Sequence, residues 1–147
     1  MVDLSIVVLA YRSEEYLKDF ALQIVGELSK ETLQYELIIV ANYDSLKDKT
    51  PQIAEEIARQ YQQVRCLTKE KQGKMGWDMR MGLDACNGNV LLVIDGDGQM
   101  PSSDIMSVYQ ALVHGKYDLI KTFRAIRMDG WWRRLMSKGY NRLFHMF

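Results

Sequence analysis

The sequence predicts an α/β domain built on a mostly parallel sheet with helices on both faces. Short apolar runs alternate along the chain with longer segments of helical periodicity, which is the pattern of strand–helix–strand units. The runs are apolar almost throughout, as expected for strands that are buried on both faces. The chain has 147 residues, which is enough for one domain with a core of its own.

The first strand is expected at residues 4–9, and the first helix follows at residues 14–29. Ser13 is predicted to cap this helix, and Glu14 and Glu15 suit the positive end of its dipole. The apolar residues of the segment recur at three- and four-residue spacing, which indicates a helix with one buried face. They are Tyr16, Leu17, Phe20, Ala21, Ile24, Val25 and Leu28.

The next two units repeat this order. Strands are expected at residues 36–40 and 64–67, and helices at residues 51–61 and 77–85. Thr50 followed by Pro51 is typical of a helix cap and a first helical residue. Asn87 with Gly88 is expected to end the second of these helices.

The fourth unit carries the most unusual residues of the chain. An apolar strand at residues 90–94 is followed by Asp95, Asp97, Gln99 and Pro101. Proline cannot continue a strand ladder, so the carboxylates are expected at the carboxyl edge of the sheet, where α/β folds bind their ligands. Two neighbouring carboxylates repel each other unless a cation lies between them. Together with an amide oxygen they offer the ligands that Mg²⁺ or Mn²⁺ prefers.

Two other kinds of acidic site fit this segment poorly. An EF-hand loop needs glycine at its sixth position and glutamate at its twelfth, and counting from Asp95 these positions hold Met100 and Met106. A haloacid dehalogenase-like phosphatase usually has Thr or Val two residues after its second acid, with the motif on the first strand. Here Gln99 holds that position and the strand is the fourth.

The last part of the chain is basic and aromatic. A fourth helix is expected from Ser102 or Ser103 to His114 and a fifth strand at residues 118–122. Of 19 basic and 19 acidic residues, seven and one respectively lie in residues 121–147, which leaves 12 and 18 in the rest. A basic segment on an acidic body is typical of contact with phosphates or an anionic surface.

Residues 131–147 have the pattern of an amphipathic helix. Two interpretations remain open: an interfacial helix on a membrane, or a helix that packs against a later part of a longer chain. Its apolar positions are Trp132, Leu135, Met136, Tyr140, Leu143, Phe144 and Phe147, and its basic positions are Arg133, Arg134, Lys138 and Arg142. The chain stops inside this pattern, which indicates a fragment or a truncated form.

Other features of the sequence point to an intracellular protein without its own membrane anchor. Cys66 and Cys86 match no metal or disulfide spacing and are read as buried or unreactive thiols. No basic leader precedes the first strand, and no run approaches the roughly 18 apolar residues of a membrane span. A cytoplasmic location is therefore expected.

Five segments together resemble a known family. They are residues 8–17, residues 35–50, the glycine pattern of residues 73–88, the Asp-x-Asp-x-Gln-x-Pro of residues 95–101 and the basic segment of residues 124–141. In this order the chain resembles the family 2 glycosyltransferases, and most closely the dolichyl- and polyprenyl-phosphate sugar transferases. Asp-x-Asp alone is a weak signal, whereas five segments at this spacing are specific. The resemblance implies the GT-A fold, a Rossmann-like, mostly parallel sheet.

The resemblance also implies a reaction. An inverting enzyme of this kind moves a sugar from a nucleoside diphosphate, UDP- or GDP-linked, to a polyprenyl phosphate, with Mg²⁺ or Mn²⁺ as cofactor. Asp97 and Gln99, with Asp95, are the implied metal ligands, and Asp95, Asp97 and Arg124 are the implied catalytic residues. The implied contacts to the nucleotide sugar are Leu9, Ala10, Tyr11, Lys74, Asp95, Gly96, Arg124 and Arg127.

The chain departs from the family pattern at the nucleoside loop. The family usually has paired acids after its second strand, and Ala41 and Asn42 stand in those places. Asn42 or Asp44 is expected to take over their role, and Arg12 replaces the usual Asn. Simpler interpretations stay open as well. Lys74, Arg124 and Arg127 are also typical of solvated loops, and Tyr11 is also typical of an aromatic residue in the core or at its rim.

The expected organisation and partners follow from this resemblance. Residues 1–130 are expected to form the nucleotide-sugar-binding domain, and residues 131–147 to begin an acceptor or membrane-proximal part. The alternatives to a polyprenyl phosphate acceptor are a glycan or lipopolysaccharide hydroxyl, and a binding module without turnover. A location at the cytosolic face of a membrane is expected, with no nucleic-acid partner.

Overall fold

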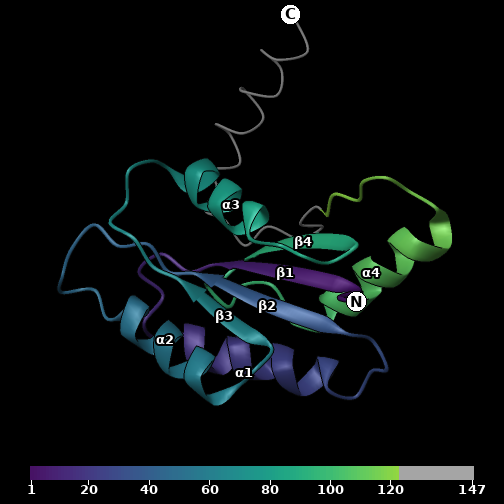
Figure 1. Ribbon diagram of the computed structural model, residues 1–147, viewed down its shortest axis with the longest axis horizontal. Helices are drawn as coiled ribbons and strands as arrows, with labels where there is room; N and C mark the ends of the chain where they lie inside the picture. Colours follow the sequence, from purple (N-terminus) through teal and green to yellow (C-terminus); the bar gives the residue numbers. More distant parts are fainter. Residues whose placement is uncertain (123–147) are drawn as a thin grey trace, which may run out of the picture.

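The protein is described by a computed structural model that covers residues 1–122 in detail (Figure 1). Strands and helices alternate along this part of the chain. They are β1 (Leu4–Leu9), α1 (Leu17–Leu28), β2 (Tyr35–Val40), α2 (Thr50–Gln60), β3 (Val64–Leu67), α3 (Met75–Asp84), β4 (Val90–Asp95) and α4 (Asp104–Gly115). Within these residues, none of the helices combines the length and the apolar character that crossing a membrane requires.

The four strands form one parallel sheet in the order β3-β2-β1-β4. The chain runs outward from β1 to β3 and then returns to place β4 on the other side of β1. This change of direction makes a topological switch point between β1 and β4, and α/β sheets bind ligands outside the carboxyl ends of such strands. Leu9 is paired in register with Asp95 at that point.

The main core lies between the sheet and the helices α1 and α2, which cover the same face (Figure 1). Alternate residues of the strands point into it because successive side chains of a strand face opposite sides. α4 adds Ile105 to this core, and Ser102, just before α4, donates a hydrogen bond to Glu27 of α1 at 2.9 Å. Its fully buried large side chains include Leu4, Ile6, Leu17, Ile24, Leu28, Leu37 and Ile39.

The opposite face of the sheet is covered by α3, over β1 and β2 (Figure 1). Val7, Ile38 and Val40 are buried there. Gly82 lets the helix approach closely, because a Cβ at this position would overlap Val7 and lie 3.0 Å from Val40 Cγ2. Cover of both faces is thus confirmed for the centre of the sheet, whereas Leu91 and Val93 of β4 are 47% and 36% exposed on this side.

The prediction of a fifth strand at residues 118–122 is wrong. Residues 118–122 form no strand, and Leu119 is 82% exposed. Leu119 and Ile120 supply the apolar pattern of a strand, but a strand also needs a hydrogen-bonded neighbour, and β4 pairs only with β1 in the described part of the chain. The local pattern was therefore not sufficient.

The start of the first helix also differs from the expectation. α1 begins at Leu17, and the residues from Glu14 to Tyr16 form a turn in which the Ser13 carbonyl accepts hydrogen bonds from the amides of Tyr16 and Leu17. The Ser13 amide is held by Thr50 Oγ1 at 3.0 Å, so tertiary contact rather than capping fixes this residue. Thr50 is itself the first residue of α2 and not its cap.

Candidate functional site

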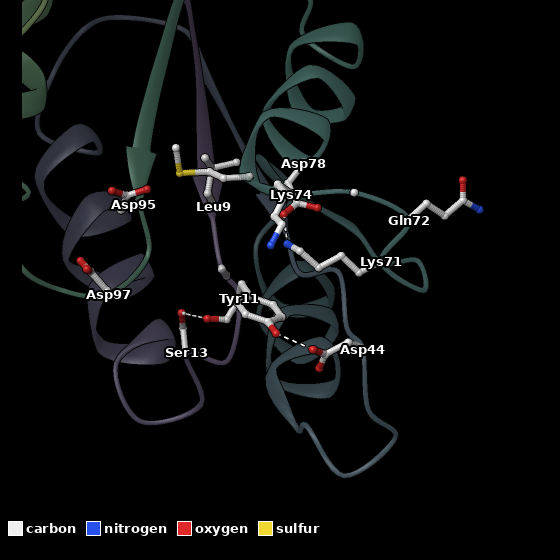
Figure 2. Close-up of a pocket in the computed structure, with 13 residues that line it drawn as sticks. Leu9, Tyr11, Ser13, Asp44, Lys71, Gln72, Lys74, Asp78, Asp95 and Asp97 are labelled. Atoms are coloured by element: carbon white, nitrogen blue, oxygen red, sulfur yellow. Dashed lines mark hydrogen bonds and ion pairs between the residues drawn. The ribbon is translucent and has the colours of Figure 1, made fainter. Parts of the chain in front are cut away.

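A cavity of about 800 Å³ opens at the carboxyl edge of the sheet, beside the ends of β1 and β4 (Figure 2). Five segments line it: the end of β1 with the residues after it, the loop after β2, the loop leading into α3, the first turn of α3, and the end of β4 with the residues after it. The lining residues are Leu9, Ala10, Tyr11, Ser13, Asp44, Lys71, Gln72, Gly73, Lys74, Met75, Asp78, Asp95 and Asp97.

The end of β4 brings two carboxylates into this cavity. Asp95 is the last residue of the strand, and the Gly96 amide donates a hydrogen bond to the Leu9 carbonyl at 2.9 Å. A Cβ at Gly96 would lie 3.0 Å from Val8 Cγ1 and 3.1 Å from the Leu9 carbonyl, so only glycine fits without a shift. The Asp97 carboxylate accepts a hydrogen bond from the main-chain amide of Gln99 at 3.0 Å, and this contact orients the carboxylate.

Asp95 and Asp97 have the chemistry of a shared metal site. Within residues 1–122, neither carboxylate has a cationic side chain within 4.0 Å, and no cluster of three or more metal-ligating His, Cys, Asp or Glu side chains occurs. Mg²⁺ is commonly held by one or two carboxylates together with the phosphate oxygens of a ligand. The residues present therefore fit a divalent ion that a bound diphosphate would share.

The opposite end of the cavity is formed by Tyr11 and Asp44 (Figure 2). The Tyr11 hydroxyl donates a hydrogen bond to Asp44 Oδ2 at 2.5 Å, and Arg12 contacts both carboxylate oxygens at 3.0 Å. The hydrogen bond from Tyr11, followed by the one from Arg12, holds the pKa of the Asp44 carboxyl below its usual range. The same hydrogen bond raises the pKa of Tyr11, because losing the proton would break it.

A second polar network, formed by Asn42, Asp78 and Lys71, adjoins the ring of Tyr11. Asn42, which is buried, donates from Nδ2 to Asp78 Oδ1 at 2.8 Å and accepts from the Lys69 amide at 2.8 Å. Asp78 is paired with Lys71, whose ammonium lies 4.3 Å from the centre of the Tyr11 ring. The side-chain amide of Asn42 is therefore engaged inside the protein, whereas Asp44 lines the cavity.

Most of the predicted site residues meet in one place. Leu9, Ala10, Tyr11, Asp44, Lys74, Asp95 and Asp97 line the cavity. Gly96 and Asn42 are buried next to it and do not line it, and Gln99 is exposed outside it, so its role as a metal ligand stays a prediction. Arg124 and Arg127 lie outside the described residues.

Sequence reasoning missed six lining residues: Ser13, Lys71, Gln72, Gly73, Met75 and Asp78. For Asp78 a signal existed. It stands one helical turn before Gly82, which faces the sheet, so a helical reading places this carboxylate on the inner face of α3. Its 5% exposure confirms that position. Lys71 gave no such signal, because a lysine in a polar loop is usually solvated.

Two solved structures with nucleotide-sugar ligands share this fold. Staphylococcus aureus TarS (residues 1–349), solved in complex with UDP-GlcNAc, matches with a TM-score of 0.61 and 18% identity over 88% of this chain and 37% of its own. The mannosyltransferase PcManGT of Pyrobaculum calidifontis, solved in complex with GDP-Man and Mn²⁺, matches with a TM-score of 0.58 and 16% identity over 74% and 32%. These likenesses confirm the predicted GT-A fold.

Sequence relatives point in the same direction. The undecaprenyl-phosphate 4-deoxy-4-formamido-L-arabinose transferases of Edwardsiella ictaluri and Photorhabdus laumondii are 27% and 30% identical to this chain over 95% and 93% of its length. The chain spans 42% of the length of each. The family profile described as "Glycosyl transferase family 2" matches residues 5–146. Because this match covers almost the whole sequence, the protein belongs to glycosyl transferase family 2.

Proposed function

We propose that this chain is the nucleotide-sugar-binding part of an inverting, metal-dependent glycosyltransferase that delivers its sugar to a polyprenyl phosphate. One observation carries the proposal: Asp95 and Asp97, without cationic partners among residues 1–122, share a cavity with Tyr11 and Lys74. A nucleoside diphosphate that spans this cavity would place its phosphates near the two carboxylates and its base near Tyr11.

The chemistry of the leaving group explains these residues. A nucleoside diphosphate leaves only when its developing negative charge is neutralised, and a divalent ion bound to its phosphates supplies part of that charge. Lys74, an exposed cavity residue with no carboxylate within 4.0 Å in the described part of the chain, is positioned to contact a phosphate. Arg124 and Arg127 are proposed to add cationic charge from the following segment.

The similar proteins support the finer choices. The names of the Edwardsiella and Photorhabdus relatives specify undecaprenyl phosphate, which supports a polyprenyl phosphate acceptor. The proposed place of the reaction is the cytosolic face of a membrane. The complexes of TarS with UDP-GlcNAc and of PcManGT with GDP-Man and Mn²⁺ support a UDP- or GDP-linked donor and Mg²⁺ or Mn²⁺ as cofactor.

The lining carboxylates favour an acceptor that is already ionised. A hydroxyl acceptor needs a general base to take its proton, whereas a lipid phosphate does not. Among the described lining residues, Asp44 and Asp78 are engaged by Arg12 and Lys71, and Asp95 and Asp97 are proposed to hold the metal ion. Transfer to a glycan or lipopolysaccharide hydroxyl would therefore need a base from outside residues 1–122.

A second candidate is a module that binds nucleotide sugar without turning it over. This alternative is favoured by the lining of the cavity, in which the described residues are assigned to a donor and a metal ion and none to an acceptor. The two candidates make the same prediction for donor binding and differ in transfer. An assay with radiolabelled donor and undecaprenyl phosphate in detergent separates them, because only the enzyme would make lipid-linked sugar.

Calorimetry tests the donor site that both candidates share. UDP- and GDP-sugars are titrated into the chain with and without Mn²⁺, and we expect binding that depends on the metal and that Asp97→Ala abolishes. Asp84→Ala, a matched removal of an exposed carboxylate at the end of α3, should bind normally. Metal-independent binding, or none, would remove the proposal.

The membrane part of the proposal concerns residues 131–147, which lie outside the described residues. Flotation with liposomes that contain anionic lipid compares the chain with a version that ends at Gly130. We expect the full chain to float and the shorter one to stay in the aqueous fraction, because basic and apolar residues together drive interfacial binding. Equal partition of the two would contradict this part.

A further inference from the structure

We propose that Lys71, held in place by Asp78 and Asn42, selects the nucleobase of the donor together with Asp44. The selected bases are those with an N–H beside a C=O on one edge, as in uracil and guanine. This inference rests on the proposed function, because it requires a nucleotide in the cavity. It assigns base selection to a lysine that no part of the family motif contains.

The main chain around Lys71 is fixed by the sheet. Tyr43 and Glu70 form a parallel bridge beyond the ends of β2 and β3. The Tyr43 amide donates to the Lys69 carbonyl at 3.0 Å, and the Lys71 amide donates to the Tyr43 carbonyl at 2.8 Å. The loop that carries Lys71 is thus a short continuation of the strand ladder, and its side chain starts from a defined position.

The side chain of Lys71 is also held by contacts within the protein. It is 14% exposed, its ammonium is paired with the Asp78 carboxylate, and it lies over the Tyr11 ring (Figure 2). A buried ammonium is costly unless a counter-ion and hydrogen bonds compensate for its lost hydration. Lys74, three residues later on the same cavity wall, stays exposed and has no such partner among residues 1–122.

Lys71 and Asp44 retain free hydrogen-bonding capacity at the base end of the cavity. An ammonium has three N–H donors, and Asp78 takes one of those on Lys71. A carboxylate offers about four acceptor sites, and at Asp44 one hydrogen bond from Tyr11 and two from Arg12 use three of them. Both residues contact Tyr11 and line the cavity, Asp44 at the tyrosine hydroxyl and Lys71 at its ring, so one aromatic side chain is flanked by a donor and by an acceptor.

This pair discriminates between bases by matching and by repulsion. Uracil and guanine present a C=O that Lys71 can donate to and an adjacent N–H that Asp44 can accept. Cytosine and adenine present an amino group beside a bare ring nitrogen. The amino group would then face the ammonium and the lone pair would face the carboxylate, which penalises both contacts.

Asn42 and Asp78 are a matched pair that keeps Lys71 in place. An acid at position 42, where the family pattern has one, would bring a second carboxylate within about hydrogen-bond distance of Asp78, since the present contact is 2.8 Å. The neutral amide of Asn42 instead donates to Asp78. In this chain the carboxylate that faces Lys71 comes from α3, and exchanging the residues at positions 42 and 78 should preserve the charge that faces Lys71.

The test measures affinities of the full chain for UDP, GDP, CDP and ADP by calorimetry in the presence of Mn²⁺. We expect the better of UDP and GDP to bind at least about tenfold more tightly than CDP and ADP, since each comparison involves a charged hydrogen bond. Lys71→Met should bring the four affinities to within about threefold. Lys74→Met, the matched control, should weaken the binding of all four nucleotides by the same factor, because a contact to phosphate is independent of the base.

The exchange of residues separates positioning from general damage. Asp78→Asn should lose base selection, and the double variant Asn42→Asp with Asp78→Asn should recover it, with thermal unfolding measured for each. Ligand variants test the same contacts on the unaltered protein: N3-methyl-UDP removes the donor for Asp44, and 4-thio-UDP weakens the acceptor for Lys71. If UDP is the preferred nucleotide, each analogue should bind at least about tenfold more weakly than UDP. If GDP is the preferred nucleotide, the corresponding guanine analogues are used instead.

Three results would overturn the inference, and they can be told apart. If folded Lys71→Met keeps the original ranking of the four nucleotides, the role of Lys71 is wrong and the nucleotide site stands. If the unaltered chain binds none of the nucleotides with Mn²⁺, the proposed function fails and this inference fails with it. Full affinity for both modified forms of the preferred nucleotide would also overturn it, whatever the variants do.

Discussion

The hydroxyl of Tyr11 donates a hydrogen bond to the carboxylate of Asp44 at 2.5 Å, and this contact joins the end of β1 to the loop after β2. Such a short distance is typical of a hydroxyl that donates to an ionised acceptor. Arg12, with a φ of 51° that side-chain-bearing residues rarely adopt, turns the chain so that its guanidinium reaches the same carboxylate. Backbone strain of this kind is often retained at binding sites.

Replacing Tyr11 by Phe should weaken nucleotide binding without unfolding the protein. The ring is kept, but Asp44 loses its hydrogen bond from the hydroxyl and is held by Arg12 alone. We expect about a tenfold loss of affinity for the preferred nucleoside diphosphate in calorimetry. Tyr16→Phe is the matched control, because Tyr16 is 51% exposed and does not line the cavity. Equal effects of the two substitutions would rule out a role for the Tyr11 hydroxyl.

The protonation of Asp44 gives a second prediction. Its carboxyl has a lowered pKa in the folded protein, chiefly because it accepts the Tyr11 hydrogen bond. The free energy by which the ionised Asp44 carboxylate stabilises the fold is complete above its ordinary pKa of about 3.9. This contribution is lost as the pH falls through the lower pKa of the folded state. Tyr11→Phe removes this hydrogen bond, so the pKa of Asp44 should rise in that variant. An NMR titration of the labelled Asp44 carboxyl carbon measures this, and an unchanged pKa would contradict the assigned cause.

The sequence was sufficient for those parts of the fold and site that local patterns encode. The four paired strands are continuous apolar runs, so their positions could be read directly. Asp95 and Asp97 follow from where such a run ends, because a parallel sheet brings the carboxyl ends of its strands to one edge. Leu9 and Tyr11 could be placed for the same reason.

Features that depend on contacts between distant segments could not be read in this way. Asn42, Lys71 and Asp78 come from three different elements, and only the folded chain shows that they hold one another. A turn at residues 14–16 stands where a helical start is predicted, and next to it the Ser13 amide donates to Thr50, which lies far away in the sequence. Residues 118–122 have the composition of a strand but pair with none of the four described strands, although one edge of β4 is unpaired within residues 1–122.

The close approach of α3 to the sheet predicts opposite effects for two glycines of one helix. Gly82→Ala would force the helix away from Val7 and Val40, since its Cβ finds no room. We expect a loss of about 1–3 kcal/mol of unfolding free energy in urea denaturation. Gly76→Ala is the control. Its Cβ would meet nothing within 4 Å, so reduced freedom of the unfolded chain should stabilise the protein by about 0.4–1 kcal/mol. Equal effects would mean that α3 does not pack as described.

Glu36 supplies a prediction about stability that is independent of the ligand site. It is buried near the amino ends of the strands, where it accepts hydrogen bonds at 2.6 Å from the Ser5 hydroxyl and from the Asn87 amide. Ser5 also accepts from the Gly88 amide at 2.8 Å, so this cluster ties the turn before β4 to β1 and β2. Burial raises the pKa of Glu36, but the hydrogen bonds and nearby Arg65 outweigh it and hold the pKa below its usual value.

Glu36→Gln should therefore destabilise the fold by about 2 kcal/mol near neutral pH, which is the usual contribution of a hydrogen bond to an ionised group. Glu56→Gln, on the exposed face of α2, should stay within about 0.5 kcal/mol of the unaltered protein. Because the folded pKa of Glu36 is lowered, the advantage of the unaltered protein over Glu36→Gln is full above the ordinary pKa of about 4.3 and shrinks as the pH falls through the folded value. Urea denaturation of all three proteins between neutral and acidic pH measures this difference. A difference that stayed constant down to the lowest pH would show that packing, rather than the ionised carboxylate, accounts for the contribution of Glu36.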